Sequence, residues 1–366
     1  MLDRATRQRL LLASFAVVPF YSAPVVIAYA IGTLNVSAVE AARFPALLMG
    51  TKLAVLLVAP MLNGGQTVAR YLRTLLCLAA AAILACAVVG SGFDMWRAAA
   101  IPIGIASGGL FLFGTQIALE STVKTQAFLM RLAFSLLLAG LLSGAFFLMP
   151  PDEVGTGILS LIAAVYLGIA ALLPPPTNVA EPQLQAARTS EPFWPLALIF
   201  VLFVGRTGFF AFHLAAASAN FSADMTPALA AARIGAAVIL LASLRRGAVL
   251  LSLPMVGFYV AEIGTILAIS LTQTVVVLVI AVILYEITLN CLCAQSQGMT
   301  GQRAPNRAMR FLSLMVIAGA MTGPVVFGQV STYLGSEGAI MICCLAIAAP
   351  LLLQWPLRKN QAAQSR

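Results

Sequence analysis

The sequence is poor in charge. Asp, Glu, Lys and Arg together make up 9% of its 366 residues, whereas a soluble domain carries roughly 25%. There is one His, and no nucleophile elbow, metalloprotease His pair or phosphate-binding glycine loop with its lysine occurs. These absences exclude an ordinary soluble enzyme, argue against ATP-driven transport by this chain, and predict that it needs no cofactor.

Cysteine is scarce as well, and its placement excludes two kinds of site. All six cysteines fall inside apolar runs, which argues against a disulfide framework. Cys291 and Cys293 are two residues apart, so in a helix they point to different faces and do not form a soft-metal pair. We therefore expect no bound metal.

Long apolar runs make up most of the chain. Hydrophobic residues account for 61% of it, and the mean hydropathy is +1.00. Runs of about 20 residues, the length that crosses a bilayer as a helix, recur throughout, so the sequence predicts an all-α polytopic membrane protein. The twelve predicted transmembrane helices cover residues 10–32, 41–62, 75–92, 98–118, 126–149, 155–173, 194–218, 226–244, 248–271, 273–296, 308–331 and 337–356.

The basic residues predict how these spans are oriented. The formal net charge is +9, but Lys and Arg are dispersed with no basic stripe, so no nucleic-acid partner is expected. Because Lys and Arg near span ends stay on the cytoplasmic side, we place both termini in the cytoplasm and the chain in the cytoplasmic (inner) membrane. The basic residues that then lie inside are Arg4, Arg7, Arg9, Arg70, Arg73, Lys124, Arg131, Arg188, Arg245, Arg246, Arg303, Arg307, Arg310, Arg358, Lys359 and Arg366.

One connection is much longer than the others. Residues 174–192 read PPPTNVAEPQLQAARTSEP, a polar, proline-rich stretch that cannot span a membrane. Six predicted spans lie on either side of it. The sequence therefore predicts an N-terminal six-helix bundle over residues 1–173, a cytoplasmic linker over 174–192 and a C-terminal six-helix bundle over 193–366.

Short motifs in two connections carry a resemblance to a known family. Residues 65–73, between the second and third spans, read GQTVARYLR, and the matching connection of the second half contains Arg245-Arg246-Gly247. With the six-plus-six layout, these remnants resemble the major facilitator superfamily, whose halves are related by an axis along the membrane normal. The resemblance implies that helices 1, 4, 7 and 10 line a central path and that the two bundles rock around it.

The chain also departs from the family pattern. Ala69 and Leu72 stand where the loop motif has an acid and a second glycine, and the fourth span has Gly104 without the arginine that precedes it in many antiporters of the family. An export mechanism that depends on that arginine is therefore not expected here. Conformational or gating roles are expected for the following residues, with simple helix packing as the alternative for the glycines of the eleventh span: Gly65, Arg70, Arg73, Gly319, Gly323 and Pro324.

Ionisable residues inside the spans are the most informative ones, because a charge at mid-bilayer costs roughly 2.5–3.5 kcal/mol. If the seventh and tenth helices line the path, Arg206 and Glu286 face the same cavity, and we predict that they form a pair. The planar guanidinium of Arg206 suits bidentate binding of a carboxylate or phosphate. Glu286 would then be the titrating partner that couples binding to proton movement.

Other residues surround this predicted pair. We expect Lys52, Arg233, Tyr21, Gln116 and Asn290 to contribute to substrate binding. Glu262 and His213 are further candidates for proton coupling, with Glu262 either paired with Arg233 or protonated at a protein-facing position. The alternative is that the buried charges form permanent ion pairs that only fix helix packing.

These observations predict a secondary active transporter of a small organic solute, anionic or zwitterionic because basic residues exceed acidic ones in its core. Its partners would be that solute, protons and the lipid bilayer, and we expect it to act as a monomer. One alternative is proton-coupled efflux of hydrophobic or cationic compounds, with Glu262 or Glu286 attracting the cation. Another is a transporter-like membrane sensor or assembly factor that moves no solute.

Overall fold

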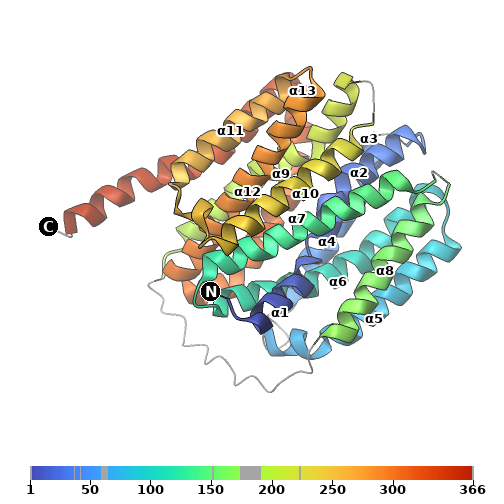
Figure 1. The fold of residues 1–366 in the computed structure, drawn as a ribbon, viewed down its shortest axis with the longest axis horizontal. Helices are drawn as coiled ribbons and strands as arrows, with labels where there is room; N and C mark the ends of the chain where they lie inside the picture. Colours follow the sequence, from blue (N-terminus) through green and yellow to red (C-terminus); the bar gives the residue numbers. More distant parts are fainter. Residues whose placement is uncertain are drawn as a thin grey trace.

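The computed structural model describes residues 2–36, 38–41, 43–58, 65–150, 152–173, 191–221 and 224–364. Nearly all of these residues are helical, and the long helices lie side by side in one bundle (Figure 1). Helices are the expected form because the hydrocarbon core offers no water to backbone N–H and C=O groups, which must be satisfied within the segment.

The first half of the chain contains eight helices in the described residues. The first predicted span is divided into two of them, α1 (Arg4–Ser14) and α2 (Val18–Gly32). The others are α3 (Ala38–Ala41), α4 (Arg43–Val58), α5 (Gly65–Val89), α6 (Gly92–Glu120), α7 (Lys124–Leu148) and α8 (Val154–Leu172).

The second half begins with α9 (Trp194–Phe221) and ends with α13 (Pro305–Gln364). Gly335 interrupts α13 with φ 72°, a left-handed conformation that glycine adopts without strain, and so separates the eleventh predicted span from the twelfth. Between α9 and α13 lie α10 (Thr226–Arg245), the 3₁₀ helix η2 (Val249–Ser252), α11 (Met255–Leu271) and α12 (Val275–Arg303).

The helices agree with the predicted spans. Nine helical segments of the described chain are long and apolar enough to cross a membrane, with Arg4–Gly32 taken as one of them. The remaining three predicted spans coincide with α4 and with the shorter apolar segments Met255–Leu271 and Glu337–Leu351. The chain is an all-α, multi-pass membrane protein. Most of the predicted linker, residues 174–190, lies outside the described residues, so the division into two domains stays a prediction.

Several contacts join helices of the two predicted halves. Among them, α7 packs against α10, and α4 packs against α13. A glycine permits the first approach: a Cβ at Gly140 would lie 3.1 Å from the backbone oxygen of Ala230. These interfaces bring helices from both halves around one central space, which contains the candidate site.

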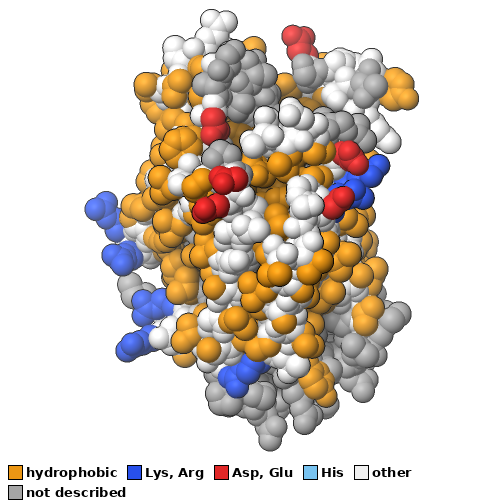
Figure 2. Space-filling view, turned by 90° about the vertical axis from the view of Figure 1, so that its right-hand side faces the viewer, with side chains coloured by type: hydrophobic (Ala, Val, Ile, Leu, Met, Phe, Trp, Pro, Cys, Tyr) orange, Lys and Arg blue, Asp and Glu red, His pale blue; other side chains and the backbone are white. Residues whose placement is uncertain are grey.

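Acidic and basic side chains separate on the visible surface. In Figure 2 the acidic side chains gather toward the upper part of the molecule, whereas most basic side chains lie lower. The middle of this face is mainly hydrophobic, as expected for a surface in contact with lipid.

Candidate functional site

A cavity lies at the centre of the helical bundle. Residues of α2, α4, α6, α7, α9, α12 and α13 line it, so both predicted halves contribute to its wall. Its volume is about 60 Å³, room for only a few water molecules. Most of the lining is apolar or aromatic, and the charged lining residues are Lys52, Arg131 and Arg206.

The break between α1 and α2 supplies a polar group to this region. Pro19 has no N–H, and the N–H of Phe20 binds the carbonyl of Val17 at 3.0 Å instead of continuing the α-helical pattern to Ala16. The carbonyl oxygen of Ala16 accepts a hydrogen bond from Lys52 Nζ at 2.9 Å. The helix break therefore gives the buried ammonium a neutral partner.

Lys52 is predicted to bind substrate, and it does lie at the cavity. Its side chain is 2% exposed, and its Nζ is 4.4 Å from the ring centroid of Phe111. No carboxylate among the described residues lies within ion-pair distance of it. Within the described part of the chain, the contacts of the Lys52 ammonium are a carbonyl and an aromatic ring.

Arg131 lies at the cavity and not among the cytoplasmic span-end charges, where the sequence predicts it. It is 1% exposed and lines the cavity together with Lys52. Its Nη1 donates to Thr115 Oγ1 at 2.9 Å, its Cζ is 4.7 Å from the ring centroid of Phe111, and its Nε has no hydrogen-bond partner. The signal in the sequence was its apolar surroundings, LM before it and LAF after it.

The predicted pair of Arg206 and Glu286 is wrong. Arg206 binds Glu262 of α11 through two parallel hydrogen bonds, Nε to Oε1 at 2.8 Å and Nη2 to Oε2 at 2.5 Å. Its Nη1 donates to Cys293 Sγ at 2.6 Å. Arg206 lines the cavity as predicted, but its charge is already balanced by a bidentate carboxylate.

Glu286 pairs instead with Arg233 of α10, so the suggested Arg233–Glu262 pair is also wrong. The contact is a single one, Arg233 Nε to Glu286 Oε1 at 3.4 Å. Arg233 Nη1 donates to Ser143 Oγ of α7 at 3.3 Å, while Arg233 Nη2 and Glu286 Oε2 are buried without a partner. This second pair is much less completely bonded than the first.

Three further predicted residues surround the second pair. Tyr21 Oη donates to Asn290 Oδ1 at 3.2 Å, a bond between α2 and α12, and the Arg233 guanidinium lies 5.6 Å from the Tyr21 ring. His213 is buried, and its Nδ1 lies 2.7 Å from the carbonyl of Phe210 in its own helix. Tyr21 also lines the cavity, so it connects the cavity with the Arg233–Glu286 pair.

Gln116 and the predicted gating residues lie elsewhere. Gln116 Nε2 donates to Glu120 at the end of α6 and is not among the cavity-lining residues. Arg73 donates to the carbonyls of Ala170 and Leu173, so it satisfies the C-terminal end of α8. Gly65 begins α5, and the side-chain surroundings of Gly65 and Arg70 lie outside the described residues.

The glycines of the eleventh predicted span pack against α9. A Cβ at Gly319 would lie 2.6 Å from the Phe200 oxygen, and a Cβ at Gly323 would lie 2.7 Å from the Gly208 nitrogen. Both contacts join helices within the second predicted half, and Pro324 follows in the same helix. The contacts are those of close helix packing, and a role of these residues in rocking stays a prediction.

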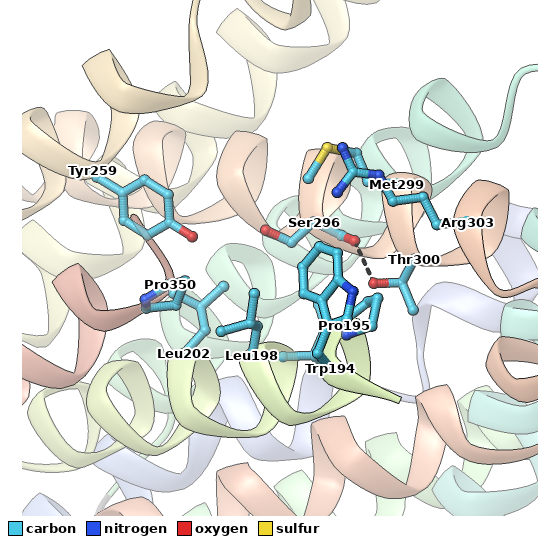
Figure 3. A pocket seen from close by; sticks show the side chains of 11 residues that line it. Trp194, Pro195, Leu198, Leu202, Tyr259, Ser296, Met299, Thr300, Arg303 and Pro350 are labelled. Carbon is cyan, nitrogen blue, oxygen red and sulfur yellow. Dashed lines mark hydrogen bonds between the residues drawn. The ribbon is translucent and has the colours of Figure 1, made fainter. Parts of the chain in front are cut away.

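A second, smaller pocket of about 20 Å³ lies between α9, α11, α12 and α13 (Figure 3). Arg303 lies over the ring of Trp194 at 5.4 Å from its centroid, and the hydroxyl of Thr300 bonds to the backbone of Ser296. None of the predicted intramembrane charges lines this pocket. The central cavity is therefore the better candidate for a solute site.

Comparison with known proteins finds similarity at the level of structure. No protein-family model matches the chain, and no curated protein matches it. The human organic anion transporter MFSD10 (TETRAN) is 16% identical with a TM-score of 0.67 over 95% of this chain and 97% of that one. FucP, a major facilitator superfamily transporter solved in the outward conformation, is 15% identical with a TM-score of 0.60, covering 95% of this chain and 96% of that one.

Proposed function

We propose that this chain, which has the fold of the major facilitator superfamily, is a secondary transporter of a small organic anion. It would work by alternating access, with the central cavity as the solute site. The predicted fold class, an all-α membrane protein of the major facilitator type, is confirmed, and the transport function is the proposal that this fold and this cavity support.

The observation that carries the proposal is a pair of buried cations that have no carboxylate partner among the residues the structure describes. Lys52 and Arg131 both line the cavity, and both lie against Phe111. Burying a charge without a counter-charge is costly, so an anion that supplies the missing charge binds there with a gain. The named activity of MFSD10 as an organic anion transporter agrees with this polarity.

Contacts between the two predicted halves support alternating access. Tyr21 of α2, which lines the cavity, binds Asn290 of α12. At the ends of α7 and α12 that are predicted to be cytoplasmic, a Cβ at Gly298 would lie 3.0 Å from the Cα of Thr125. In the proposed cycle these contacts between the halves open and close as the halves rock.

Glu286 is the proposed proton carrier. One of its oxygens is buried without a bonding partner and the other is 3.4 Å from Arg233, so the pair separates more readily than the bidentate Arg206–Glu262 pair. Arg233 of α10 is the only charged group paired with Glu286 in the described chain; Tyr21, Ser143 and His213 approach Arg233 from α2, α7 and α9. Protonation of Glu286 would release Arg233.

The test is transport by purified protein in liposomes that contain a pH-sensitive dye, screened with pooled organic anions and with cationic drugs. We expect an organic anion to evoke proton movement. The variants Arg131→Met, which removes a cavity cation, and Glu286→Gln, which removes the carrier, should abolish it. Glu153→Gln, at an exposed acid outside the cavity, is the control and should transport normally.

Two outcomes would overturn the proposal. Proton movement evoked by cationic drugs, but not by anions, would favour the alternative of cation efflux through Glu262 or Glu286. The second outcome is that no solute moves, while cells that express a variant with Arg233 and Glu286 exchanged have the same phenotype as cells with the native chain. In that case the buried charges are permanent pairs. The protein would then be a sensor or assembly factor.

A further inference from the structure

Resting on the proposed function, we propose that the cavity selects an amphiphilic anion: one compact anionic head bound between Lys52 and Arg131, and an apolar body in the aromatic part of the cavity. A monocarboxylate or monosulfonate with an aromatic or branched hydrocarbon body has this chemistry. Sugars, and anions with two separated carboxylates, do not.

The head site is built from two helices around one ring. Lys52 comes from α4 and Arg131 from α7, and their charged atoms lie 4.4 and 4.7 Å from the same Phe111 centroid. Both residues also line the same cavity, and the proposal places one carboxylate or sulfonate between them. The N–H of Arg131 Nε, buried and without a partner, is an available donor for one of its oxygens.

The remainder of the cavity wall is mostly apolar, and its uncharged polar side chains are Tyr21, Thr207, Cys293 and Gln297. Its wall includes the rings of Phe20, Phe203 and Phe210, with Val316 and Ile317 of α13 beside them. The rings of Phe20 and Phe210 are stacked at 5.4 Å between centroids, so this part of the wall is aromatic. Burial of a hydrocarbon body against such a surface contributes roughly 25 cal/mol per Å².

The distribution of counter-charges limits the solute to one anionic head. The third cation at the cavity, Arg206, is already bound by both oxygens of Glu262. The fourth cation nearby, Arg233, faces Glu286. A second carboxylate at the far end of the solute would therefore be buried without a free cation, which is costly.

The test compares a matched set of small probes on the purified chain in nanodiscs: phenylacetate, phenylmethanesulfonate, acetate, benzyl alcohol, benzylamine and 1,4-phenylenediacetate. We expect phenylacetate and the sulfonate to bind most tightly by calorimetry and to exchange in a liposome counterflow assay. Lys52→Met and Arg131→Met keep the apolar stems but remove the charges. Each should weaken phenylacetate binding about tenfold or more, whereas Arg246→Met, at an exposed position, should not.

Each outcome of this comparison has a defined meaning. Equal binding of acetate and phenylacetate, or tighter binding of 1,4-phenylenediacetate, would overturn the amphiphile proposal while leaving organic anion transport intact. Preference for benzylamine, or absence of all anion binding, would overturn both. Size-exclusion elution and a thermal unfolding midpoint near that of the native chain identify folded variants. If Lys52→Met does not fold, Lys52→Arg serves instead, and it should keep the preference for phenylacetate over acetate.

Discussion

At the scale of single residues, the two buried ion pairs differ in how completely they are bonded. Arg206 and Glu262 share two hydrogen bonds, whereas Arg233 and Glu286 share one contact at 3.4 Å. A pair that must stay closed benefits from the first arrangement, and a pair that opens during a cycle benefits from the second. The sequence contains the same residue types in both, so the difference comes from the geometry alone.

This difference predicts unequal stability losses. Glu262→Gln leaves the Arg206 charge buried without its counter-charge and should cost about 3–5 kcal/mol, whereas Glu286→Gln removes a weaker contact and should cost less. The measurement is the thermal unfolding midpoint of each variant in the same detergent. Replacing both partners of the first pair, Arg206→Met with Glu262→Met, should recover part of the loss. Equal shifts of the unfolding midpoint in Glu262→Gln and Glu286→Gln would contradict the conclusion that the first ion pair is the more completely bonded one.

Residue-level predictions from the sequence are correct about the burial of five intramembrane charges, but they miss the burial of Arg131 and are wrong about the ion-pair partners. The rarity of charges in apolar runs identified Lys52, Arg206, Arg233, Glu262 and Glu286, and all five are 2% exposed or less. Helical periodicity shows which residues share a face, but it does not show which neighbouring helix that face meets. The pairing therefore required the packing of α9 against α11 and α10 against α12.

At the scale of elements, the packing of α9 against α13 depends on small residues in both helices. A Cβ at Gly323 would meet backbone atoms of α9, including the nitrogen of Gly208 at 2.7 Å, and backbone cannot move aside as a flexible side chain can. Gly208 in turn faces the backbone oxygen of Gly323. The two helices are therefore closest at these glycines.

Gly323→Ala should separate α9 from α13. Overpacking of this kind costs about 1–3 kcal/mol, and we expect a lower unfolding midpoint and less folded protein after purification. Gly144→Ala is the matched control, because no atom lies within 4 Å of a Cβ at that helical position and alanine favours helix by about 1 kcal/mol. A midpoint unchanged by Gly323→Ala would contradict the packing described for this interface.

Hydropathy predicted the existence of the helices well, but it did not predict their interruptions. Nine predicted spans coincide with described helices that are long and apolar enough to cross a bilayer, and the other three overlap shorter apolar helices. The turn between α1 and α2 was missed because Val17 and its neighbours are as apolar as the helices around them. The helix break at Pro19 leaves the carbonyl of Ala16 available, and this carbonyl accepts a hydrogen bond from Lys52, 36 residues away in the chain. Hydropathy does not predict that contact.

At the scale of the whole molecule, the orientation in the membrane is a prediction that cysteine labelling can test. Asp152 precedes α8, and Arg246 follows α10; both are exposed. With both termini inside, Asp152→Cys should react with a membrane-impermeant maleimide added to intact cells. Arg246→Cys should react only after the cells are permeabilised, and the native chain, with its own cysteines, is the background control. The reverse pattern would invert the assigned topology.

The order of synthesis gives the two ion pairs a role in biogenesis. Arg206 precedes Glu262 by 56 residues, and Arg233 precedes Glu286 by 53, so each arginine enters the bilayer before the ribosome has made its acid. A chain that stops before α11 therefore contains two uncompensated arginines in addition to Lys52 and Arg131, each costing roughly 2.5–3.5 kcal/mol in lipid. Completion of α12 removes both penalties. The charges that hold the finished molecule together thus also distinguish a complete translation product from a truncated one.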